Sequence, residues 1–215
     1  RDAAHLRAAL SGDTGARLKA RFDDEHFIAP AFIDYGARHL LGREALTRPE
    51  ALRGLTIRAV QSPLHTRLWS AFGATPVGIP IPETYNALQT GVADAMDLTK
   101  SAYAGFRLYE VVPHLTETGH IRAAGIVCFS APFWNGLSDE ERQVFAEAAR
   151  EGAAYFDALV VADEAKAMEI AAAHGGAVHQ SEAREEWEKG ARAVWADFAE
   201  TVGGMERIEE TAAAG

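Results

Sequence analysis

Two arginines lie in parts of the sequence where a positive charge is costly. Arg58 lies within the apolar run 55–60, and Arg38 follows the end of another apolar run, 26–36. A buried guanidinium needs a partner, because removing an unpaired charge from water is expensive. Its planar set of N–H donors matches a carboxylate, which either a bound organic acid or an internal Asp or Glu would supply. The pattern therefore predicts a site near these residues that binds an anion or forms an ion pair.

Three acidic residues, Glu83, Asp94 and Asp97, are the candidates for acid–base chemistry. Carboxylates three residues apart, such as Asp94 and Asp97, can exchange protons with a substrate or bind a cation. The simpler interpretation is a helix cap and a solvated acid, with Glu83 as a charge in the first turn of a helix. A hydrolase built on these three carboxylates stays open as an alternative function.

Other catalytic patterns are missing from the sequence. It contains no G-x-S-x-G, P-loop, G-x-G-x-x-G or H-E-x-x-H motif. The eight histidines are scattered without a recognisable metal-ligand spacing. The single cysteine, Cys128, excludes an intramolecular disulfide and is predicted to be an inert core thiol. We therefore expect a protein that is not an enzyme and that has no cofactor and no metal site of a recognisable motif.

Composition and charge limit the kind of molecule that this protein is expected to bind. The 215 residues are 48% hydrophobic and 24% charged, which is typical of a globular protein. The formal net charge is −10, and the excess of acids lies in residues 138–215. An acidic chain does not attract nucleic acid through a general electrostatic field, so we expect no nucleic-acid partner.

Hydrophobic periodicity predicts alternating helices and strands, hence an α/β protein. We expect strands at 26–36, 55–60 and 118–130, an extended segment at 75–82, a strand or loop after Asp94, and a short strand at 177–180. We expect helices at 2–10, 14–22, 62–74, 82–94 with Gly91 at its end, 100–115 as far as Pro113, and 182–202. Ser138 and Glu141 form a capping box, which predicts the start of a helix that continues to about Ala173. Such a helix is about 50 Å long, more than a small domain spans, so we expect it to connect two lobes.

Several long segments together resemble one family. They are LRGLTIRAVQSP at 52–63, the stretch 69–97 with its A-L-Q-T-G-V-A-D core, LYEVVPHLTETGH at 108–120, residues 134–142 and YGARHLL at 35–41. In these segments the chain resembles the solute-binding proteins of TRAP-type (tripartite ATP-independent periplasmic) transporters, the DctP-like family. The resemblance covers essentially the whole chain.

The resemblance implies an α/β fold of the periplasmic binding protein type. Two lobes close on a ligand as in a Venus flytrap, and a long helix spans both of them. The first lobe is expected to be incomplete, with its opening strands and helices missing ahead of Arg1. Residues 1–35 and 124–163 are then the remnant of the N-terminal lobe with the hinge helix, and residues 36–123 and 164–215 form the C-terminal lobe.

The resemblance also assigns site residues. The carboxylate-binding arginine of the family falls on Arg58, and a second arginine falls on Arg38. Asp97 stands where the family has a glutamate and is expected to accept a hydrogen bond from a ligand hydroxyl or amine. Leu98 replaces an asparagine that contacts sialic acid in some relatives, and Ile81 replaces a pocket aromatic residue.

The function implied is the capture of a small organic acid and its delivery to TRAP membrane permease subunits. Trp134 follows the end of a predicted strand and is a further candidate for lining the cleft. The resemblance places the protein in the periplasm, although no signal peptide is present in this chain. The ligand, a bridging metal and the choice between monomer and dimer stay open. Alternatives are a ligand-sensing module with the same fold and a helical interaction scaffold.

Overall fold

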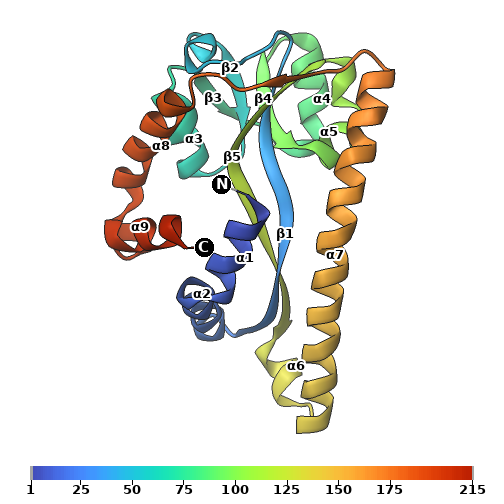
Figure 1. The fold of residues 1–215 in the computed structure, drawn as a ribbon, viewed down its shortest axis with the longest axis vertical. Coiled ribbons are helices and arrows are strands. Elements are labelled where there is room, and N and C mark those ends of the chain that lie inside the picture. Colours follow the sequence, from blue (N-terminus) through green and yellow to red (C-terminus); the bar gives the residue numbers. More distant parts are fainter. Residues whose placement is uncertain (1, 215) are drawn as a thin grey trace. The chain divides into compact units, whose positions relative to one another are not determined.

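Three long elements each contribute residues to two compact units of the chain (Figure 1). They are the strands β1 (Phe27–Gly42) and β5 (His114–Ser130) and the helix α7 (Asp139–Ala173). The computed structural model describes residues 2–214. Unit 1 comprises Arg1–Gly36, Arg122–Asp163 and Glu210–Gly215, and unit 2 comprises Ala37–Ile121 and Glu164–Glu209. The α/β class predicted from the sequence is confirmed.

Unit 2 is built on a mixed sheet in which three neighbouring strands at one side are parallel. The six-stranded sheet found within residues 2–214 has the order β3-β2-β4-β1-β5-β6. Its other strands are β2 (Thr56–Ala59), β3 (Thr75–Gly78), β4 (Ala95–Thr99) and β6 (Ala177–Gln180). β2 runs parallel to both β3 and β4, and β6 runs parallel to β5. β1 pairs antiparallel with β4, so that Arg38 lies opposite Thr99.

Helices cover both faces of the unit 2 sheet (Figure 1). They are α3 (Pro63–Ala71) and α8 (Arg184–Phe198) on one face, and α4 (Ile81–Thr90), α5 (Lys100–Gly105) and the end of α7 on the other. Leu40 packs in the cluster that contains Trp69 of α3 and Val194 of α8, whereas Leu41 packs with Met96 and other residues on the opposite face. Neighbouring strand residues point to opposite faces, so a strand covered on both sides is apolar without alternation.

Unit 1 contains α1 (Ala3–Ser11), α2 (Asp13–Asp24), α6 (Ala131–Asn135) and the first part of α7. Its apolar cluster joins Ala31 of β1 to Ala149 and Ala153 of α7. Small side chains let the helix approach the strand closely. The remaining short elements are α9 (Met205–Ala213) and the 3-10 turns Pro49–Leu52, Leu108–Glu110 and Glu200–Val202.

A buried ion pair links β1 and β5 within unit 1. Arg122 donates from Nε and Nη2 to Oδ2 of Asp34, at 2.9 and 2.6 Å. The other carboxylate oxygen, Oδ1, accepts the backbone N–H of Gly36 at 2.9 Å, and the N–H of Asp34 itself bonds to Asp157. Asp34 is only 6% exposed. The Asp34 carboxylate therefore links β1 to β5 and also bonds to the backbone of β1 two residues further on. This ion pair lies next to the boundary of unit 1 in both strands.

Several local predictions are confirmed. The capping box is formed, because Glu141 Oε2 accepts the N–H of Ser138 at 2.8 Å and Ser138 Oγ accepts the N–H of Glu141 at 3.2 Å. The helix that follows ends at Ala173, as expected. Gly91 ends α4 in the left-handed conformation, with φ of 80°.

Other local predictions are wrong. The helix expected over 100–115 ends at Gly105, because Arg107 adopts a left-handed conformation with φ of 53°. Asp97 lies inside the strand β4 and not at the end of a helix. Cys128 is exposed, since its neighbours Val127 and Phe129 take the inward positions of β5 and leave the cysteine on the other side.

Candidate ligand-binding site

The candidate site lies at one edge of the unit 2 sheet. Because β2, β3 and β4 are parallel, their carboxyl ends meet at the same edge, which is where open α/β sheets bind ligands. Arg58 lies near the end of β2, Ile79 follows β3, and Asp97 is the middle residue of β4. Arg38 reaches this edge from the antiparallel strand β1, opposite Thr99. The sheet thus brings two arginines and an aspartate together from distant parts of the sequence.

Asp97 is the internal partner of Arg38. Arg38 Nε donates to Asp97 Oδ2 at 2.5 Å, and Arg38 Nη2 donates to the backbone oxygen of Asp97 at 2.7 Å. The Asp97 side chain is fully buried, and that of Arg38 is 13% exposed. The positive charge of Arg38 is therefore compensated within the protein.

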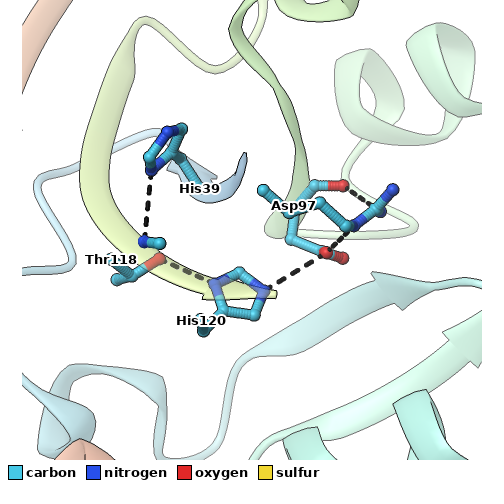
Figure 2. Close-up of polar contacts among 6 residues, drawn as sticks. His39, Asp97, Thr118 and His120 are labelled. Atoms are coloured by element: carbon cyan, nitrogen blue, oxygen red, sulfur yellow. Dashed lines mark hydrogen bonds and ion pairs between the residues drawn. The ribbon is translucent and has the colours of Figure 1, made fainter. Parts of the chain in front are cut away.

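His120 adds a third group to this pair (Figure 2). Its Nε2 lies 3.3 Å from Asp97 Oδ2, and its Nδ1 lies 2.7 Å from the hydroxyl of Thr118. The geometry fits Nε2–H as the donor to the carboxylate and the Thr118 hydroxyl as the donor to Nδ1. The adjacent Gly119 donates its N–H to His39 Nδ1 at 3.2 Å. These bonds hold His120 against Asp97 from β5.

Opposing effects act on the Asp97 carboxyl. Burial raises its pKa, but the contacts with His120 and Arg38 outweigh burial and hold the pKa well below the ordinary 3.8. Asp97 is therefore an ionised carboxylate at neutral pH.

Unlike Arg38, Arg58 forms no hydrogen bond or ion pair with an acidic side chain in the described part of the chain. It is 5% exposed, and its Nε donates to the backbone oxygen of Ile79 at 2.8 Å. Within residues 2–214, its two terminal nitrogens have no hydrogen-bond partner. Burial lowers the pKa of Arg58, yet a guanidinium stays charged in proteins. Arg58 thus presents the planar N–H edge that binds a carboxylate with two hydrogen bonds.

Helix α3 supplies two more polar groups, on residues one turn apart. His65 Nδ1 and Trp69 Nε1 are buried and unpaired in the described part of the chain, as is Asp97 Oδ1. Burial lowers the pKa of His65 and outweighs the opposing effect of the Asp97 charge, so its imidazole is neutral at neutral pH. The Trp69 ring meets the His120 ring edge-on, with 4.9 Å between centroids. These groups extend the site from the sheet edge to α3.

His65, Trp69 and His120 were not among the site residues predicted from the sequence. A usable signal was present, because a helix that begins directly after the strand of Arg58 carries His65 and Trp69 on one face. No comparable local signal identifies His120, because the β1–β4–β5 arrangement places it.

The remaining predicted site residues lie elsewhere. Ile81 is the first residue of α4 and is 36% exposed. Leu98 points away from the Asp97 side of β4 and packs in the apolar cluster of Leu41. Trp134 belongs to α6 of unit 1, where it stacks on Phe129 at 5.4 Å. Their contact with a ligand stays a prediction.

The carboxylates considered for hydrolysis do not form a catalytic group with Asp97. Asp94 Oδ2 accepts the N–H of Thr56 at 2.8 Å, which ties β4 to β2. Glu83 is exposed in the first turn of α4, where it is a helix charge. Residues 2–214 contain no group of three or more side chains able to hold a metal ion. None of the helices described there has the length and apolarity to cross a bilayer.

Acid should remove the contribution of Asp97 to stability. A carboxyl whose pKa is lowered by folding stabilises the protein fully above its unfolded pKa, here about 3.8, and loses this effect as the pH falls through the still lower folded value. Asp97→Asn should lower the free energy of unfolding by about 1–2 kcal/mol at pH 7, because asparagine keeps an acceptor oxygen but loses the charge. Thermal unfolding of both proteins from pH 7 to pH 3 tests this. The gap should be constant above about pH 5 and narrow below pH 4; a gap that widens in acid would contradict the assignment.

The fold and the site define a class. An α/β protein with an uncompensated, buried arginine at the carboxyl edge of its parallel strands is suited to binding a small organic anion. The family model "Bacterial extracellular solute-binding protein, family 7" (DctP) matches residues 1–201. The chain belongs to this family, whose members are binding proteins and not enzymes.

Individual relatives agree with the family. A solute-binding protein of Verminephrobacter eiseniae is 33% identical over 169 residues, which are 78% of this chain and 50% of the relative. The 2,3-diketo-L-gulonate-binding periplasmic protein YiaO of Escherichia coli is 30% identical over 79% of this chain and 52% of its own. The chain thus spans about half the length of the curated relatives that it matches.

Solved structures show the same fold. A TRAP periplasmic solute-binding protein of Roseobacter denitrificans with bound β-D-glucuronate superposes with a TM-score of 0.94 at 25% identity, over 100% of this chain and 72% of that one. One from Polaromonas with bound D-erythronate gives 0.91 at 26% identity, over 100% and 71%. The periplasmic binding protein fold expected from the sequence is confirmed.

Proposed function

We propose that this protein is the periplasmic solute-binding component of a TRAP transporter, and that it captures a small organic acid and delivers it to the membrane permease. The observation that carries the proposal is the free guanidinium edge of Arg58. A ligand carboxylate there would neutralise Arg58, which is buried and has no internal acid bonded to it. Asp97, held by Arg38 and His120, would accept a hydrogen bond from the rest of the ligand.

The relatives support a carboxylate as the ligand class. The Roseobacter and Polaromonas structures hold a uronate and an aldonate, and the Rhodobacter capsulatus relative is named a C4-dicarboxylate-binding protein. Each of these ligands carries a carboxylate. We extend the proposal to the lobes, with residues 1–35 and 124–163 as the remnant of the N-terminal lobe and residues 36–123 and 164–215 as the C-terminal lobe.

Ligand binding would act by shifting a conformational equilibrium. A ligand that contacts both lobes favours the closed state by its difference in affinity for the two states. The permease then distinguishes the closed, loaded protein from the open one. No covalent step is involved, so no nucleophile or general base is required of the site.

Calorimetry on the intact natural protein tests the proposal with D-glucuronate, D-galacturonate, D-erythronate and succinate. D-glucose serves as the matched neutral control, because it differs from D-glucuronate only in carrying a CH2OH group in place of the carboxylate. We expect at least one acid to bind, and to raise the free energy of unfolding by about 2.7 kcal/mol at a hundred times its Kd. Binding of glucose as tight as that of glucuronate, or binding of no acid at all, would contradict the proposal.

A further inference from the structure

The site contains a small and countable set of charges. Arg38 and Asp97 form a buried pair that is neutral as a whole, and Arg58 has no acid bonded to it. Helix α3 contributes His65, whose pKa is lowered by burial, and β5 contributes His120, which contacts Asp97 Oδ2 and the Thr118 hydroxyl. Among the two arginines and the aspartate of the site, one positive charge is therefore left without an internal acid. One carboxylate on the ligand balances it.

The second carboxylate oxygen of Asp97, Oδ1, determines which chemical group of a ligand can lie beside it. Oδ2 serves Arg38 and His120, whereas Oδ1 is buried and has no partner in the described part of the chain. A buried acceptor without a donor costs free energy, and a ligand hydroxyl that donates to Oδ1 removes this cost. A second carboxylate placed there would be repelled by Asp97, and a cationic group would leave the site with excess positive charge. A neutral donor fits best.

From this charge balance we propose that the site selects hydroxylated monocarboxylates over dicarboxylates, and that Asp97 is the residue that makes the selection. The inference deepens the proposed function and rests on it. Arg58 then binds the carboxylate that every ligand shares, and Asp97 Oδ1 accepts a hydrogen bond from another group of the ligand.

The test compares two acids that differ at one carbon. D-erythronate and meso-tartrate have the same four-carbon skeleton and the same central hydroxyls, but tartrate carries a second carboxylate where erythronate has a CH2OH group. D-gluconate and D-glucarate repeat the comparison with six carbons. Calorimetry on the intact natural protein should show the monoacid binding at least about tenfold more tightly than its diacid, since a single unbalanced charge in a buried site is worth at least that.

Variants of the site then test whether Asp97 causes the preference for the monoacid. Asp97→Asn removes one negative charge and should reduce the preference for the monoacid at least about tenfold. The double change Arg38→Gln with Asp97→Asn removes both charges of the pair and should restore the preference. Glu182→Gln is the matched control, because Glu182 also pairs with an arginine, Arg48, but half-exposed at the surface. It should leave the ratio of the two dissociation constants unchanged.

Three results would overturn the preference for monoacids, the role of Asp97, or both. Equal or tighter binding of the diacid by the natural protein would overturn it without any variant, so it stays falsifiable even where Asp97→Asn does not fold. An unchanged ratio in folded Asp97→Asn would overturn the role of Asp97 alone, while binding that still depends on the carboxylate would leave the proposed function intact. Failure of all acids to bind the natural protein would overturn the proposed function and this inference with it.

Discussion

Replacing Arg58 with alanine is expected to weaken the binding of a carboxylate at least about 100-fold, because hydrogen bonds to charged groups contribute about 1.5–3 kcal/mol each and Arg58 offers two of them. The protein should remain folded. Arg58 is buried without an acid bonded to it, so its removal relieves a desolvation cost and loses the single bond to Ile79.

Two further variants separate the causes of such a loss. Arg58→Lys keeps the positive charge but not the planar pair of donors, so it should bind more weakly than the natural protein and more tightly than Arg58→Ala. Arg48→Ala removes an exposed arginine and should leave affinity unchanged. Calorimetry measures the affinity, and circular dichroism verifies the fold. A folded Arg58→Ala protein with natural affinity would refute the assignment of this residue.

Asp34→Ala should produce the largest loss of stability, about 3 kcal/mol of the free energy of unfolding. Its carboxylate binds Arg122 with two hydrogen bonds and also accepts the buried N–H of Gly36. Removing it leaves a largely buried guanidinium and a buried N–H without their partner, which costs more than the pair itself contributes.

An exposed aspartate–arginine pair is the control for that measurement. Arg67 and Asp197 also form an ion pair over a long sequence distance, but their side chains are 46% and 42% exposed. Asp197→Ala should cost less than about 1 kcal/mol, because water screens and replaces the interaction. Equal losses for Asp34→Ala and Asp197→Ala in urea unfolding would mean that burial of the Asp34 pair has no special importance.

Local signals accounted for much of the fold. The capping box at Ser138 and the glycine at the end of α4 depend on residues within one helical turn, and both were predicted correctly. The apolar periodicity of the long helix predicted its end at Ala173. The segment after Gly105 failed because its helical pattern continues while the backbone at Arg107 turns left-handed.

The site was only partly predictable, because its geometry depends on strand pairing. Arg38 and Asp97 were both expected to contact a ligand, but they are 59 residues apart and pair with each other once β1 aligns with β4. His120 was set aside as one of several scattered histidines, since separation along the chain carries no information about its distance from Asp97. Arg58 was identified because it is a single charged residue within an apolar segment. This inference requires no knowledge of how the strands align.

Both units contain segments that are far apart in the sequence. The apolar cluster of each unit can therefore be completed only after its last segment has been translated. The apolar cluster of unit 1 needs Ala31 and Ala153, so all its members have been made when the ribosome has passed the middle of α7. The cluster that holds Trp69 needs Val194 of α8, which is translated 125 residues after its partner. Helix α3, with His65 and Trp69, must therefore wait for α8 before its packing is complete. The packing around the candidate site is therefore completed only late in the synthesis of the described residues.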